Sequence, residues 1–205
     1  MKILLLSLVT ILITSCSVFG VADIEEPNYE VLLEEDNFQV RKYPDTLVAQ
    51  TTTTGSYQET SSKGFERLAG YIFGDNVAKE KISMTAPVLR EKKSEKIEMT
   101  APVYRQQDDS DWIMTFVLPS EYTLDTAPTP NDKKVIVKQL PGNKVATLRY
   151  SGRMTEASLD EHTQKLENWV KEKDFSVIGM AYSAAYDPPW TLPMLRRNEI
   201  HIQIE

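Results

Sequence analysis

The sequence predicts a single domain of the α+β class. Two segments with helical periodicity, residues 57–73 and 155–173, are each preceded by predicted strands and followed by two more. Strands in this order, separated by short polar turns, favour an antiparallel sheet with both helices packed against it. Because the order strands, helix, two strands occurs twice, we expect two pseudo-symmetric halves.

The amino terminus is expected to lie outside this domain. Residues 1–15 carry one positive charge and then an apolar run too short to span a bilayer, which is typical of a secretory signal peptide. The run ends in Ile13-Thr14-Ser15-Cys16, which resembles a lipobox and predicts a mature chain beginning at a lipid-bearing Cys16. The alternative is an ordinary signal peptide cut near Ser15 or Gly20, which would leave a free thiol.

Lipidation would place the protein in the bacterial cell envelope, facing the periplasm from the outer membrane in a Gram-negative cell. Residues 16–28 are then a lipidated cysteine and tether, and residues 29–205 the single domain. Cys16 is the only cysteine, so the domain has no disulfide and depends on its core. A net charge of −7 disfavours nucleic acid and anionic lipid surfaces, so the acyl chains must provide the membrane contact.

The first half is expected to begin with a three-stranded meander over residues 29–35, 38–45 and 46–56, which are rich in β-branched and aromatic residues. The helix at 57–73 follows and ends before Gly74. Its apolar residues recur at i, i+3, i+4 and i+7 and are Phe65, Leu68, Ala69 and Ile72.

A repeated motif follows this helix. Residues 81–90 and 96–105 both contain Met-Thr-Ala-Pro-Val, at a spacing of 15, and predict a hairpin. Met84 and Met99 each alternate with aliphatic residues on one strand face, so we expect both to fill the core rather than to bind iron.

The second half is expected to contain a strand at 112–119, a Pro-rich loop at 123–132 and a hairpin of 134–140 with 144–152. In the helix at 155–173, Ser158 and Glu161 resemble a capping box. Leu159, Leu166, Trp169 and Val170 form its apolar stripe. Strands at 175–186 and 197–204 close the domain.

Several short motifs extend from about residue 29 to the end of the chain. They are Tyr29-Glu30-Val31, Arg41-Lys42-Tyr43, Gly64-Phe65, Met84-Thr85-Ala86-Pro87-Val88, Tyr186-Asp187-Pro188-Pro189 and Arg196-Arg197-Asn198-Glu199. With these motifs the chain resembles the SOUL family of haem-binding proteins. The resemblance implies a distorted antiparallel β-barrel flanked by two main helices, similar to the effector-binding domains of some bacterial regulators.

The resemblance also implies a ligand, haem or another tetrapyrrole. Some members of the family bind it through a histidine directly before the tyrosine of the first hairpin, and others in a hydrophobic cleft beside the first helix. Lys42 occupies the histidine position here, so the cleft mode is the one expected. The protein is then a monomer that binds a small hydrophobic ligand weakly, without an axial histidine.

A tetrapyrrole needs an apolar wall for its ring and cations for its carboxylates. Phe65, Leu68 and Ile72 of the first helix are the expected wall, with Lys63 and Arg67 as the cations; alternatively, the stripe only packs on the sheet. A second wall is expected from the last loop, formed by Tyr186, Trp190, Met194 and Leu195. Arg196, Arg197 and Glu199 are alternatively a structural ion network.

Neither histidine is expected to bind iron. His162 borders the apolar stripe of the second helix, and His201 lies on the strand face opposite Ile200, Ile202 and Ile204, where solvent is its expected neighbour. Because no catalytic or metal-binding motif occurs, we predict a non-enzyme. Two alternatives stay open: an envelope interaction protein without porphyrin, and a hydrolase or effector-binding module with a carboxylate or tyrosine inside the cleft.

Overall fold

The computed structural model describes residues 25–92 and 111–205. The expected signal peptide, Cys16 and the second Met-Thr-Ala-Pro-Val copy with Met99 lie outside the described residues. The strands are β1 (Glu30–Glu35), β2 (Phe38–Tyr43), β3 (Thr46–Thr54), β4 (Val88–Lys92), β5 (Asp111–Val117), β6 (Val135–Leu140), β7 (Asn143–Tyr150), β8 (Tyr182–Ala185) and β9 (Asn198–Ile204). The helices are α2 (Tyr57–Ile72), α3 (Glu156–Glu172) and the short 3₁₀ turn η2 (Pro193–Leu195).

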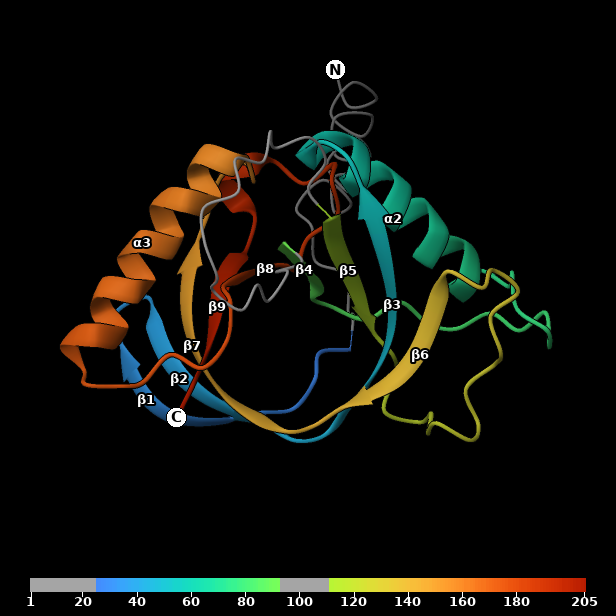
Figure 1. Cartoon of the computed structure of the whole chain (residues 1–205), viewed down its shortest axis with the longest axis horizontal. Coiled ribbons are helices and arrows are strands. Elements are labelled where there is room, and N and C mark those ends of the chain that lie inside the picture. The colour runs from blue at the N-terminus through green and yellow to red at the C-terminus, as the bar shows by residue number, and fades with distance from the viewer. Residues whose placement is uncertain (1–24, 93–110) are drawn as a thin grey trace, which may run out of the picture.

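The described strands form one antiparallel sheet in the order β1-β2-β7-β9-β8-β4-β5-β3-β6. The unit β2-β3-α2-β4-β5 and the unit β6-β7-α3-β8-β9 occupy equivalent places on either side of the β4–β8 pair. The sheet curls into an open barrel with α2 and α3 outside it, and both helices begin at the same end of the molecule (Figure 1). The predicted α+β class, the presence of two pseudo-symmetric halves and the flanking helices are therefore confirmed, although the strand predicted at 112–119 belongs to the first half, as β5, and not to the second.

Helix α2 covers the β3, β5 and β6 side of the barrel. Its N-cap Ser56 accepts a hydrogen bond from the Glu59 amide, and the Glu59 carboxylate accepts one from the Ser56 amide, which forms a capping box. A Cβ on Gly64 would lie 3.3 Å from the Met114 side chain, so glycine allows α2 to approach β5 closely. The core beneath α2 is formed by Ala49, Leu68, Tyr71, Ile72, Ile82, Met114, Phe116, Leu118 and Val135.

Helix α3 covers the β2, β7 and β9 side. The predicted stripe is confirmed, because Leu166, Trp169 and Val170 are buried against Ile200, Ile202 and Ile204, with Leu159 partly buried beside them. The predicted cap is wrong by three residues. Thr155 is the N-cap and forms the capping box with Ser158, so Ser158 occupies the third helical position.

Two predicted strands are shorter in the structure. Strand β4 begins at Val88, and the preceding residues run outside the sheet, with Thr85 forming an isolated bridge to Glu25. Met84 is half-buried and packs against the α2 core, as expected for a core residue. Strand β8 begins only at Tyr182. Among the described residues, no helix is both long enough and apolar enough to cross a membrane.

Candidate functional site

A cleft of about 370 Å³ lies between α2 and the chain that connects β8 to β9. Tyr57, Ser61 and Phe65, spaced four residues apart on α2, line one side of it. Met114 of β5 lies on the core side, where it packs under Gly64. Val88, Ala185 and Pro189 add further apolar surface. The volume is in the range of small-molecule sites, so this cleft is the candidate site beside the first helix.

The predicted first wall divides between the cleft and the core. Phe65 lines the cleft with 38% of its surface exposed, and its ring lies edge-on to Phe116 at 5.5 Å. Leu68 and Ile72 are completely buried in the core under α2 and do not line the cleft. The apolar stripe of α2 is thus wide enough for Phe65, at its edge, to line the cleft while its centre packs on the sheet.

The predicted cations do not line the cleft either. Arg67 forms a 3.0 Å ion pair with Asp132 and donates to Thr51 Oγ1, which holds it against β3. Lys63 is exposed on α2.

The predicted second wall is also separate from the cleft. Trp190 and Met194 are each 73% exposed, Leu195 is 47% exposed, and none of the three lines the cleft. Tyr186 faces elsewhere, because its hydroxyl donates to Glu199 Oε2 at 3.0 Å. The connection meets the cleft instead through Asp187, Pro189 and Arg196.

Two arginines that the sequence did not predict to bind the ligand line the cleft, Arg90 of β4 and Arg196. Arg196 donates to the carbonyls of Thr191 and Pro189, and neither arginine forms an ion pair within the described part of the chain. The sequence carried a signal for Arg90. It follows Ala86 and Val88 at a spacing of two, so it is a charged residue on a face otherwise predicted to be apolar.

A second cavity, of about 440 Å³, lies under α3 and also reaches Arg90. Its apolar lining includes Leu159, Met180 and Ile202, but Glu91, Asp160 and Glu167 contribute three carboxylates. The α2 cleft has two arginines and one carboxylate, Asp187, which accepts the Arg197 amide at 2.6 Å. A ligand with negative substituents is therefore better matched by the α2 cleft.

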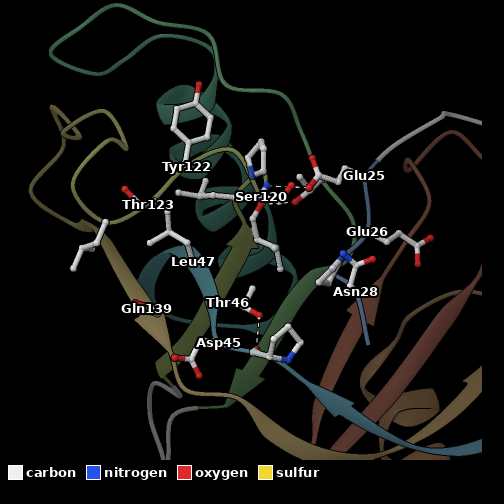
Figure 2. A pocket seen from close by; sticks show the side chains of 17 residues that line it. Glu25, Glu26, Asn28, Asp45, Thr46, Leu47, Ser120, Tyr122, Thr123 and Gln139 are labelled. Atoms are coloured by element: carbon white, nitrogen blue, oxygen red, sulfur yellow. Dashed lines mark hydrogen bonds between the residues drawn. The ribbon is translucent and has the colours of Figure 1, made fainter. Parts of the chain in front are cut away.

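A third cavity, of about 340 Å³, lies where residues 25–28 cross the ends of β3 and β5. Figure 2 shows its acidic and polar lining, with Glu25 joined to the backbone of Ser120 by a 2.9 Å hydrogen bond. Asp45 accepts the Gly142 amide at the same cavity. Its three carboxylates, Glu25, Glu26 and Asp45, make this cavity unsuitable for a hydrophobic anion.

The barrel interior holds a carboxylate with five close donor contacts. Arg41 donates to both oxygens of Glu199, at 2.7 and 3.1 Å, and Arg197 Nε donates at 3.0 Å. His201 Nε2 lies 2.8 Å from Glu199 Oε2, and the Tyr186 hydroxyl completes the set. We call these residues the Glu199 network. The predicted ion network is confirmed for Arg197 and Glu199 but not for Arg196.

Charge and burial oppose each other in the Glu199 network. Burial favours the neutral carboxyl, but hydrogen bonds and charge from His201 and Arg41 hold the pKa of Glu199 far below its usual range. Burial also lowers the pKa of His201, although Glu199 opposes that shift, so the imidazole is neutral near pH 7. The prediction that His201 faces solvent is wrong. It does lie opposite the three isoleucines, but that face is the inside of the curled sheet, where His201 is 2% exposed.

The other histidine keeps the predicted boundary position. His162 is half-buried and stacks on Tyr150 at 3.9 Å, and its Nδ1 lies 2.6 Å from the Ser158 carbonyl oxygen. It does not line the α2 cleft. Within residues 25–92 and 111–205, no group of three or more His, Cys, Asp or Glu residues is placed to hold a metal ion.

Comparison with known proteins identifies the family of the chain but does not distinguish between these cavities. The family model described as "SOUL heme-binding protein" matches residues 24–203. The chain belongs to the SOUL heme-binding family. Heme-binding protein 1 of Xenopus laevis is similar to this SOUL protein, with 26% identity over 170 residues that cover 80% of this chain and 81% of the relative. The family assignment supports haem as the ligand class.

Solved structures support the fold of this SOUL domain. The C-terminal domain of EcmrR has a TM-score of 0.60 at 13% identity and covers 86% of this chain and 98% of its own. A hydrolase from Listeria innocua has a TM-score of 0.56 at 10% identity and covers 85% of this chain and 94% of its own. At these identities the likeness concerns the fold alone.

Proposed function

We propose that this SOUL protein binds haem or a related tetrapyrrole in the α2 cleft, without an axial histidine. The observation that carries the proposal is an apolar cleft whose two arginines, Arg90 and Arg196, lack acidic partners among the described residues. A planar ring with carboxylate substituents requires this combination of apolar surface and cations.

The residues have separate roles in this proposal. Phe65 offers its exposed ring to a face of the macrocycle, and Met114 and Val88 extend the apolar surface. Arg196 supplies charge from the connection between β8 and β9. Because Lys42 replaces the histidine of some relatives, binding relies on buried area and charge pairing, and the affinity is expected to be modest. No reaction is needed, so the protein is proposed to be a non-enzymatic carrier or sensor.

The test is a titration of the purified full chain with hemin, followed by the Soret absorbance. A saturable Soret shift at one equivalent supports the proposal. Absence of saturation contradicts it and favours the interaction protein without a porphyrin. The hydrolase or effector-binding alternative requires a free carboxylate or tyrosine inside the cleft. The cleft contains Asp187, which accepts the Arg197 amide, and Tyr57, whose ring packs on the Arg90 guanidinium.

We further propose that the protein is a monomeric lipoprotein of the cell envelope, facing the periplasm where an outer membrane exists. The lipobox-like Ile13-Thr14-Ser15-Cys16 motif supports this location. Replacing Cys16 with Ala and fractionating cells tests it, with unprocessed precursor separated by its larger mass. Processed Cys16→Ala protein that remains in the membrane pellet would show that lipid is not the anchor.

A further inference from the structure

Arg90 is a buried arginine that forms no ion pair with a carboxylate of the described residues. Only 6% of its surface is exposed. Its Nη2 donates to the Tyr57 carbonyl at 2.7 Å and to Thr60 Oγ1, while Nε and Nη1 are buried and have no hydrogen-bond partner in the part of the chain that the structure describes. Nearly all buried donors in proteins are satisfied, and buried charges are normally paired. Two unused donors on one buried cation therefore indicate a missing acceptor.

Aromatic rings hold the guanidinium in position. Its Cζ lies 3.9 Å from the centre of the Tyr57 ring and 4.5 Å from that of Trp112, and the two rings meet edge to face. Cation–π contacts and the two bonds to α2 fix the plane of the guanidinium but supply no negative charge. Arg90 is thus held in place before any anion arrives.

Its position in the fold connects this cation with the cavities. Arg90 lines both the α2 cleft and the cavity under α3, so its side chain lies where the two approach each other. Glu156 of α3 favours the charged form from a distance, but it is exposed and forms no ion pair with Arg90. Burial is the main influence and lowers the pKa of Arg90, as expected for a buried cation that lacks a counterion.

We propose that Arg90 is the receptor for a carboxylate of the ligand, which would accept a hydrogen bond from one of the two unused donors, Nε or Nη1, at the inner end of the α2 cleft. This inference rests on the proposed function and adds the residue that selects acidic tetrapyrroles over neutral ones. A carboxylate is the natural partner because it supplies the negative charge that the buried guanidinium lacks, and a hydrogen bond between two charged groups is stronger than one between neutral groups.

The test compares hemin with hemin dimethyl ester, in which both carboxylates are neutralised. Wild-type protein is expected to bind hemin at least about tenfold more tightly than the ester, the size of a charge-assisted hydrogen-bond contribution. In Arg90→Met this preference should disappear, mainly through weaker binding of hemin. Arg90→Lys, which keeps the charge but not the planar guanidinium, should retain part of it.

Urea denaturation without ligand shows whether Arg90→Met is folded. In Arg90→Met the Tyr57 carbonyl still accepts from Thr60 Oγ1, so the midpoint of urea denaturation should stay close to the wild-type value. Arg67→Met is the matched arginine variant outside the cleft, because Arg67 pairs with Asp132, and it should keep the preference for hemin.

The two proposals fail in different ways. If a folded Arg90→Met variant still prefers hemin to its ester by the wild-type factor, the role of Arg90 is wrong while the proposed function stands. If the wild-type protein shows no saturable Soret shift, the proposed function is wrong, and the assignment of a tetrapyrrole carboxylate to Arg90 is wrong with it.

Discussion

Two buried arginines of this domain, Arg41 and Arg90, have opposite electrostatic environments. Arg41 is 3% exposed and donates two hydrogen bonds to Glu199. Arg90 is 6% exposed, with two donors unused. Burial lowers the pKa of both, but Glu199 more than reverses the shift for Arg41, and nothing comparable acts on Arg90. The Glu199 network is complete without a ligand, whereas the Arg90 site is completed only by an added anion.

The largest effect is expected from breaking the complete pair. Arg41→Met leaves Glu199 buried without its main cation, so the free energy of unfolding should fall by about 3–5 kcal/mol. Arg90→Met, the matched control, orphans no carboxylate and should change it by about 1 kcal/mol or less. Urea denaturation followed by circular dichroism measures both. Equal losses in the two variants would contradict the contrast between the two arginines.

Acid should weaken the Glu199 network in two steps. Burial lowers the pKa of His201 from its ordinary 6.5, so the unfolded chain binds this proton first and stability falls with pH below that value. The pKa of Glu199 is lowered from 4.5, mainly by His201 and Arg41 against the effect of burial, so a further loss follows below that value.

Glu199→Gln separates the two steps. The variant should be less stable than wild type near neutral pH, but its loss of stability below about pH 4.5 should be shallower. Urea midpoints measured between about pH 7 and pH 3 give both slopes. Parallel curves for variant and wild type would show that folding does not lower the pKa of Glu199.

Two substitutions that introduce a carboxylate test which of the two cavities beside Arg90 binds the ligand. Phe65→Asp puts a carboxylate in the α2 cleft and should weaken hemin binding by about tenfold or more, through lost apolar contact and repulsion. Met180→Asp does the same in the cavity under α3, at a residue of similar exposure, and should cost less than about threefold. The reverse result would place the ligand under α3, with circular dichroism confirming that both variants are folded.

The smallest effect is expected at His162. Because it stacks on Tyr150 and lies outside the cleft lining, His162→Ala should leave hemin affinity unchanged within about threefold. Soret titrations of the variant and the wild type give the ratio. Complete loss of the Soret shift in His162→Ala alone would mean that an axial histidine on α3 holds the iron.

Element order, both helices and the pseudo-symmetric halves follow from local patterns, and so they could be predicted from the sequence. The burial of His201 could not, because alternation along β9 separates two faces without telling which is closed by the curl of the barrel. The Phe65 stripe illustrates the same limit. Periodicity places Phe65 and Leu68 on one side of α2, while only tertiary packing decides that Phe65 meets a cleft and Leu68 the core.

The arginines proposed to bind the ligand could not be predicted from helical periodicity. Helical spacing favours Lys63 and Arg67, but Arg67 pairs with Asp132, which is far from it in the sequence. Arg90 carried a usable signal, since it follows Ala86 and Val88 on one strand face. That no carboxylate of the described residues forms an ion pair with it depends on how α2 and β5 pack together, which no local pattern reports.

The first described residues are fixed to the domain, because Glu26 pairs with Arg197 through both carboxylate oxygens and the Glu25 carbonyl accepts the Ala86 amide. With Cys16 lipidated as proposed, nine residue steps separate the acyl chains from Glu25, which is at most about 32 Å of extended chain. Arg197 directly follows Arg196 of the cleft, so this tether is attached close to the α2 cleft. A protein tethered in this way can exchange a lipid-soluble pigment with its own bilayer, but it cannot ferry that pigment to a distant membrane.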